Sequence, residues 1–177
     1  MPLSQVLHVE DAIQRISRRM PEMRVMESLI CRVITILGRD LTTRLDEALQ
    51  PAGLAELEFR TLLTIFSRDG SATPGDLSAA LAQSPANLTR LSDSLVERGL
   101  ITRNPDLEDR RRMLLTLQPA GEQLVRSLMP RIGPEISAAF ADFTATEKQQ
   151  LLGSLKRLMA GIDSINAIAV VVREENA

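Results

Sequence analysis

Residues 73–100, TPGDLSAALAQSPANLTRLSDSLVERGL, decide the fold. Two helix starts occur in this stretch, at Thr73-Pro74 and at Ser84-Pro85, each with a hydroxyl residue suited to an N-cap and a proline at the first helical position. The first helix is expected at about residues 76–82, and a helix that short must pack against its neighbours to be stable. The second helix is expected to run to Arg98 and to end at Gly99, which suits a left-handed C-cap. A short helix, a tight turn and a longer helix are typical of a helix-turn-helix.

The segment after Gly99 has a different pattern. Residues 100–103 and 113–117 are the two convincing strand candidates, although short apolar runs are ambiguous by periodicity alone. Residues 104–112 between them contain Pro105 and six charged residues, which is a composition typical of a polar loop. We therefore expect a β-hairpin, and residues 73–121 are predicted to form a winged helix-turn-helix.

The rest of the chain has the apolar spacing of amphipathic helices. We expect a short helix at residues 9–19, a long one at 23–49, a third that stops near residues 69–70 and a fourth from Pro119. Pro130, Gly133 and Pro134 are expected to kink or split the fourth helix. A capping box at residues 144–147 begins a last helix, whose expected buried residues are Leu151, Leu152, Leu155 and Leu158 or Met159. The predicted fold class is mainly α with a small β-hairpin.

Composition narrows the possible functions. A net charge of −2 argues against a protein that coats nucleic acid with its whole surface, but it allows a local basic patch. The chain has no Trp or Tyr and only four Phe, so base stacking as in single-strand or RNA binders is not expected. The N-terminus lacks an apolar signal region, and no apolar run approaches the length of a membrane span. A cytoplasmic location is expected.

The helix from Pro85 has the side chains of a DNA-reading helix. Leu88, Leu91 and Leu95 share the face expected to point into the core. On the other face, Asn can pair with adenine, Arg can pair with guanine, and Thr can meet a phosphate or a thymine methyl. Its free N-terminal N–H groups also suit phosphate oxygens. The predicted DNA contacts in this region are Ser84, Pro85, Ala86, Asn87, Thr89 and Arg90; the alternative is a cap followed by a solvated face.

The hairpin tip is the second predicted DNA contact. Arg110, Arg111 and Arg112 form the densest cationic run of the chain, and arginine suits the negative potential of a narrow minor groove. Asp109 could hold one of these arginines in direction through a salt bridge. Asp109 and Arg103 of the hairpin are included among the predicted DNA-binding residues. The alternative is a solvated tip whose charges offset one another.

These segments resemble one known family. Residues 95–103 (LVERGLITR), the run Asp109-Arg110-Arg111 and residues 115–117 (LTL) before Gly121 resemble the MarR family of bacterial transcription regulators, including its branch of multidrug-efflux repressors. The Asp-x-Arg wing signature falls on Asp109 and Arg111. Gln118 departs from the family, which usually has a threonine there to cap the next helix. The resemblance extends over nearly the whole chain.

The resemblance implies a homodimer that binds double-stranded operator DNA. Terminal helices of both chains would intertwine, and the apolar content of these helices exceeds what one small winged domain could cover. The expected organisation is dimerisation helices at residues 1–50, a winged DNA-binding domain at 51–121 and dimerisation helices at 122–177. Two-fold symmetry predicts a pseudo-palindromic operator with half-sites about 10 bp apart.

The resemblance also implies release of DNA by a small phenolic or lipophilic inducer. In this chain the crevice between the dimerisation helices and the winged domain would be lined by Ile34, Leu37, Gly38, Leu41, Phe59, Leu62 and Phe66. Gly38 is suggestive because a glycine within a helix costs stability and leaves room beside the backbone. The alternative for each of these residues is ordinary core packing.

Other chemistry has little support in the sequence. A single cysteine, Cys31, excludes a disulfide framework and a Cys-rich metal site, and it is expected to be buried and inert rather than redox-active. His8 is the only histidine, so no metal or other cofactor is expected. No phosphate loop or nucleophile elbow points to an enzyme. A winged helix that docks a protein instead of DNA is the remaining alternative.

Overall fold

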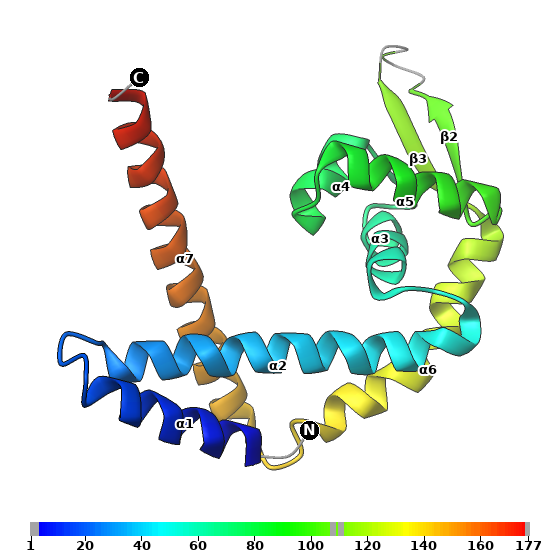
Figure 1. Cartoon of the computed structure of the whole chain (residues 1–177). Helices are drawn as coiled ribbons and strands as arrows, with labels where there is room; N and C mark the ends of the chain where they lie inside the picture. Colours follow the sequence, from blue (N-terminus) through cyan, green and yellow to red (C-terminus); the bar gives the residue numbers. More distant parts are fainter. Residues whose placement is uncertain (1–3, 107–108, 110–111, 176–177) are drawn as a thin grey trace. The chain divides into compact units, whose positions relative to one another are not determined.

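The computed structural model describes residues 4–106, 109 and 112–175, with side chains as far as residue 165 (Figure 1). The chain divides into two compact units, Met1–Ile132 and Gly133–Ala177. No helix in the described part of the chain is both long and apolar enough to cross a membrane.

Helices dominate the structure, and the predicted fold class is confirmed. The first unit contains α1, α2, a short 3₁₀ segment η1, three helices and three strands, and the second unit contains α7, while α6 crosses the boundary between them. The elements in chain order are α1 (Ser4–Ser17), α2 (Val25–Leu49), η1 (Gln50–Ala52), α3 (Glu56–Phe66), β1 (Ser71–Ala72), α4 (Pro74–Leu81), α5 (Pro85–Glu97), β2 (Ile101–Pro105), β3 (Met113–Leu117), α6 (Pro119–Ala138) and α7 (Ala145–Glu175).

The predicted hairpin is present and belongs to a three-stranded antiparallel sheet of order β1-β3-β2. Ile101 lies opposite Leu117 and Pro105 opposite Met113, so β2 extends two residues beyond the prediction. Pro105 is tolerated because β2 is an edge strand. Strand β1 was not predicted; its two residues pair with Leu115 and Thr116 of β3 and are too short for any periodicity.

Both predicted helix starts are confirmed by their caps. The Thr73 hydroxyl accepts a hydrogen bond from the Asp76 N–H at 3.1 Å, and Ser84 does the same for the N–H of Asn87 at 3.3 Å. Helix α4 ends at Leu81 and is closed by Ala82, which has a left-handed φ of 51°, and α5 is closed in the same way by Gly99 with a φ of 66°. Local side-chain chemistry thus sets the length of the short helix and the turn after it.

One apolar core joins the helix-turn-helix to the sheet and to parts of α2, α3 and α6. In Figure 1 α3, α4 and α5 gather beside the β2–β3 hairpin, and α2 extends from this group with α1 alongside it. The core residues include Leu49, Phe59, Leu62, Ile65, Leu77, Leu88, Leu95, Ile101, Leu115, Val125 and Leu128.

The structure differs from two expectations about the C-terminal helices. Helix α6 continues to Ala138, past Pro130, Gly133 and Pro134, so these residues do not split the helix, and a kink there stays a prediction. Each proline removes only one backbone donor, and the loss does not end the helix. On α7 the residues expected to be buried are 37–64% exposed, namely Leu151, Leu152, Leu155, Leu158 and Met159. Their apolar spacing was recognised correctly, but the side chains are exposed in the structure.

Gly121 has a close backbone neighbour and gives a test of the packing between α6 and the sheet. A Cβ at this position would fall on the carbonyl oxygen of Leu100 and within 2.8 Å of Cδ1 of Leu117. We expect Gly121→Ala to lower the free energy of unfolding by about 1–3 kcal/mol, because backbone cannot yield as a flexible side chain does. Chemical denaturation followed by circular dichroism measures this.

The matched control is Gly133→Ala in the same helix, where an added Cβ has no neighbour within 4 Å. Alanine favours a helix over glycine, so this variant should be stabilised by up to about 1 kcal/mol. Equal stability changes in the two variants would contradict the packing described at Gly121.

Candidate nucleic-acid interface

Helix α5 presents one face to the core and the other to solvent. Leu88, Ser92 and Leu95 are buried, and the Ser92 hydroxyl donates to the Leu88 carbonyl at 2.7 Å. Leu91, expected on the same face, is partly buried against the core. The opposite face begins with five exposed residues and the half-buried Asn87; the exposed residues are Ser84, Pro85, Ala86, Thr89 and Arg90. Burial of the apolar face therefore fixes which side chains α5 offers to a partner.

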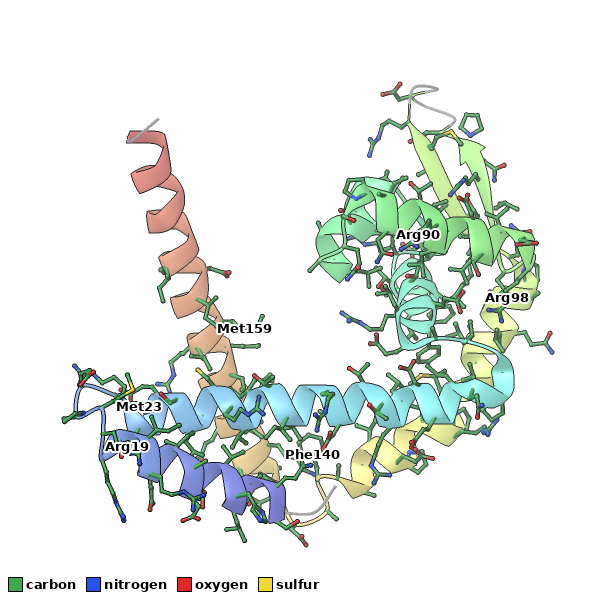
Figure 2. The ribbon with its side chains drawn as sticks, viewed as in Figure 1. Arg19, Met23, Arg90, Arg98, Phe140 and Met159 are labelled. Carbon is green, nitrogen blue, oxygen red and sulfur yellow. The ribbon has the colours of Figure 1, made fainter. Side chains whose placement is uncertain are left out.

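A chain of hydrogen bonds connects the polar residues at the start of α5. Arg90 Nη2 donates to Asn87 Oδ1 at 3.0 Å, and Asn87 Nδ2 donates to Gln83 Oε1 at 2.6 Å. Gln83 Nε2 donates to the carbonyl oxygen of Leu81 at 3.2 Å. Gln83 was not among the predicted site residues; its position directly before the cap Ser84 was the only signal in the sequence. Arg90 lies on α5, and Arg98 follows the end of the same helix (Figure 2).

Arg103 links the hairpin to α5. Its Nη1 lies 2.6 Å from Asp93 Oδ1, and its Nη2 donates to the Thr89 carbonyl at 3.2 Å. Both side chains of the ion pair are partly exposed, so the pair contributes at most about 1 kcal/mol to stability. Its value is geometric, because it holds the guanidinium of a predicted DNA-binding residue beside the exposed face of α5.

The far end of α5 is held by Glu58 of α3, which sequence analysis did not identify. Glu58 Oε1 accepts a hydrogen bond from the Ser94 hydroxyl at 2.8 Å, and Oε2 lies 3.3 Å from Arg98 Nη1. The Ala55 N–H also donates to Oε2 at 3.1 Å. The side chain of Glu58 is only 13% exposed, so this carboxylate joins α3 to α5 where water has little access. Polar contacts thus fix α5 at both ends.

The predicted wing contacts are described only in part. Arg110 and Arg111 lie outside the described residues. Asp109 and Arg112 are exposed, and the Arg112 N–H donates to the Asp109 carbonyl at 2.8 Å. The Asp106 N–H donates to the Arg112 carbonyl at 2.9 Å. Arg112 therefore lies at the end of the hairpin next to Met113, the first residue of β3.

A cavity of about 690 Å³ lies between α4, α5 and the hairpin. Its lining is mostly apolar and includes one guanidinium; it comprises Pro74, Pro85, Leu88, Arg103, Met113 and Leu115 among others. Apolar walls suit a small molecule with an apolar body, and an anionic group on it would have to compete with Asp93 for Arg103. The cavity adjoins the face of α5 that carries Thr89, so an occupant would lie next to the predicted DNA contacts.

The seven residues predicted to line a ligand crevice lie in two different environments. Phe59 and Leu62 are 2% and 0% exposed within the core, whereas Ile34, Leu37 and Leu41 of α2 are 36–55% exposed. Gly38 of α2 has open space where a Cβ would be. Phe66 is half-buried and has the guanidinium of Arg126 5.0 Å from its ring centroid. Helical spacing predicted which residues share a face, but not what lies opposite that face.

The two residues considered for redox and metal chemistry are both exposed. Cys31 is exposed on α2, so the expectation of a buried cysteine is wrong for the single chain. The His8 Nδ1 lies 2.6 Å from the carbonyl oxygen of Ser4. Among the described residues no group of His, Cys, Asp and Glu is arranged to hold a metal ion.

Comparison with known proteins finds similarity to one family. The model of the MarR family matches residues 54–113. The transcriptional repressor MprA of Escherichia coli is 28% identical over 165 residues, which cover 93% of this chain and 94% of MprA. The multiple antibiotic resistance protein MarR of Salmonella typhimurium is 28% identical over 72% of this chain and 89% of its own length.

Solved structures agree with the sequence comparisons. A crystal structure of a mutant MarR from Escherichia coli in complex with operator DNA superposes with a TM-score of 0.67 at 26% identity, over 73% of this chain and 92% of that one. AbsC, a MarR family regulator from Streptomyces coelicolor, shares the fold with a TM-score of 0.72 at 24% identity, over 80% of this chain and 97% of AbsC.

The cap of α4 gives a pH-dependent test of the helix-turn-helix. Hydrogen bonds from the Thr73 hydroxyl and N–H lower the pKa of Asp76 below its ordinary value of 3.8, and Arg68 adds to the effect. A carboxyl whose pKa is lowered by folding stabilises the protein above its ordinary pKa, and that stabilisation is lost as the pH falls through the folded-state pKa. We expect Asp76→Asn to be less stable than the parent near neutral pH and the difference to shrink in acid.

Urea denaturation at about pH 6 and about pH 3 measures this difference. Thr73→Ala is the matched control, because it removes the hydroxyl that donates to the carboxylate. In that background the effect of Asp76→Asn should be much smaller. A stability difference that does not change with pH would contradict the proposed role of the charged carboxylate.

Proposed function

We propose that the chain is a member of the MarR family and a sequence-specific DNA-binding transcriptional regulator that acts as a homodimer and represses its target genes. The observation that carries this proposal is the face of α5 that begins at its cap, Ser84, and carries Thr89 and Arg90 beside the hairpin. The likeness to MprA over nearly the whole chain supports repression as the regulatory effect. The likeness to the multiple antibiotic resistance protein MarR supports antibiotic-resistance genes as the target, and a multidrug efflux operon is our proposal for them.

The N-terminal half of α5 enters the major groove in this proposal. Arg90 is exposed and suits guanine, and the N-terminal N–H groups of the helix suit phosphate oxygens. The hairpin then reaches the neighbouring backbone or minor groove through Arg112 and through the predicted contacts Arg110 and Arg111. Arg103, held by Asp93, keeps the hairpin and the helix in one arrangement.

A second copy of the chain is the proposed partner of α7. Its exposed apolar residues recur at spacings of four and three, namely Leu151, Leu155, Leu158, Ile162 and Ile165. This is the heptad seam by which helices associate. Helix α2 has a similar exposed stripe of Met26, Ile30, Ile34, Leu37 and Leu41. Exposed apolar surface on this scale marks an interaction site. Dimerisation roles for residues 1–50 and 122–177, with DNA binding by 51–121, remain part of the proposal.

Release from DNA is the proposed response to a small phenolic or lipophilic anion. The cavity beside α5 supports this, because an apolar anion there would compete with Asp93 for Arg103 and would lie against the helix that reads DNA. The stripe on α2 that includes Leu37 and Leu41 is the other proposed place for a ligand. A regulator of this kind acts where its operator is, so we propose a cytoplasmic location. The chemistry needs no cofactor.

DNA binding is tested by fluorescence anisotropy with the DNA upstream of the chain's own gene and with random DNA. We expect preference for a specific duplex and an affinity that falls by orders of magnitude between about 50 and about 200 mM salt, because bound phosphates release counterions. Arg90→Ala should reduce the preference by about 1–3 kcal/mol. Arg60→Ala removes a similar charge from α3 and should leave the preference intact. Absence of binding to any duplex would leave a protein-docking winged helix as the alternative.

The dimer is tested by analytical ultracentrifugation of variants in the seam of α7. We expect Leu155→Glu to convert the dimer to a monomer, because an unpaired charge buried in the seam is costly. Operator binding should weaken as well, because a monomer contacts only one half-site of the operator. Ala160→Glu places the same charge outside the seam and should remain dimeric. A parent chain that is monomeric, or a Leu155→Glu variant that stays dimeric, would contradict the seam.

A further inference from the structure

The series of hydrogen bonds that connects Arg90, Asn87, Gln83 and Leu81 has one possible direction of donation. An arginine guanidinium only donates hydrogen bonds, so the Asn87 atom 3.0 Å from Arg90 is the amide oxygen. A backbone carbonyl only accepts, so the Gln83 atom 3.2 Å from the Leu81 oxygen is the amide nitrogen. The remaining contact of 2.6 Å must then run from the Asn87 nitrogen to the Gln83 oxygen. The two ends of the chain therefore fix the orientation of both amides.

This direction distinguishes Asn87 from Arg90. Asn87 is half-buried; its oxygen accepts from Arg90 of α5, and its nitrogen donates to Gln83 in the turn before the helix. The amide keeps a second N–H and a second lone pair, but an adenine that used them would have to reach a half-buried side chain whose position these two hydrogen bonds fix. Arg90 is exposed and has committed only Nη2. Its other N–H donors remain for the two acceptors of a guanine edge.

This series of hydrogen bonds begins at the turn between α4 and α5, which holds Gln83 in place. The Gln83 N–H donates to the Ser78 carbonyl at 3.1 Å, and the Ser78 hydroxyl donates to the Gln83 carbonyl at 2.6 Å. Ala82 next to it has the left-handed conformation that closes α4. The backbone of Gln83 is thus held on both sides by α4. Its side chain transmits the position of the turn to Asn87, four residues further on.

We propose that Arg90 is the base-reading residue of α5, and that Gln83 and Asn87 are positioning residues that aim its guanidinium at one guanine. This inference rests on the proposed function as a DNA reader and assigns roles within it. A guanidinium already held in direction loses less freedom when it binds. Gln83 thereby determines specificity without contacting a base, and Asn87 acts through Arg90 and not through an adenine of its own.

The test measures affinities for a panel of operator duplexes in which every base pair is replaced in turn. Arg90→Ala, Asn87→Ala and Gln83→Ala should all lose discrimination at the same G·C pair. For Gln83→Ala we expect a loss of about 2- to 10-fold at that pair, the range of one net hydrogen bond, with unchanged affinity for random DNA. Loss of discrimination at a separate A·T pair in Asn87→Ala would overturn the proposal.

A double-mutant cycle separates positioning from a general structural effect. In the Arg90→Ala background, Gln83→Ala should have no further effect on discrimination, because the residue it positions is gone. Independent, additive losses would overturn the proposal. Gln83→Glu keeps an acceptor for Asn87, loses the donation to the Leu81 carbonyl and adds a charge near the phosphates. It should retain more of the base preference than Gln83→Ala while binding all duplexes more weakly, and a preference lower than that of Gln83→Ala would count against the proposal.

The duplex preference of the parent protein distinguishes failure of this inference from failure of the proposed function. If the parent prefers no duplex, the proposed function fails. If it prefers an operator but Gln83→Ala keeps full discrimination, only the positioning role fails. Thermal unfolding of each variant shows that it is folded, and Asn87→Ala provides a second route to the same answer should Gln83→Ala not fold.

Discussion

The burial of the apolar face of α5 is the interaction on which the rest of the site depends. Leu88 and Leu95 are buried in the core that α5 shares with α3 and the sheet. Truncation of a buried leucine typically costs about 2–5 kcal/mol, so rotation of α5 about its axis is strongly opposed. Because one face must be inside, Thr89 and Arg90 must be outside. The chemistry offered to DNA therefore follows from hydrophobic packing.

Polar contacts then refine the orientation that packing sets. Glu58 holds the end of α5 through Ser94 and Arg98, and Arg103 holds the hairpin to its middle. Each contact is weak as a source of stability where it is exposed. Together they connect α5 to α3 on one side and to the hairpin on the other. A ligand in the cavity beside Arg103 would disturb this arrangement directly, which provides a physical route from ligand binding to DNA release.

The sequence predicted well those features that depend on residues close together in the chain. Thr73 and Ser84 cap their helices with their own hydroxyls, so α4 and α5 were placed correctly. Contacts distant in sequence were not predictable: Glu58 and Ser94 are 36 positions apart, and helical spacing says nothing about such pairs. The apolar seam of α7 was found, but its burial was wrongly expected, since helical spacing identifies an apolar face and not the surface that would cover it. The two-residue strand β1 left no pattern at all.

The central claim is that the N-terminal half of α5 lies in the major groove of an operator. Methylation protection of guanine N7 tests it most directly, because N7 faces the major groove and accepts from arginine. An operator selected from random-sequence DNA should show protected guanines in two half-sites about 10 bp apart, one for each copy of α5. Both protections should be lost in Arg90→Ala. Binding without any protected guanine, or protection only of adenine N3 in the minor groove, would contradict this account of how the protein reads DNA.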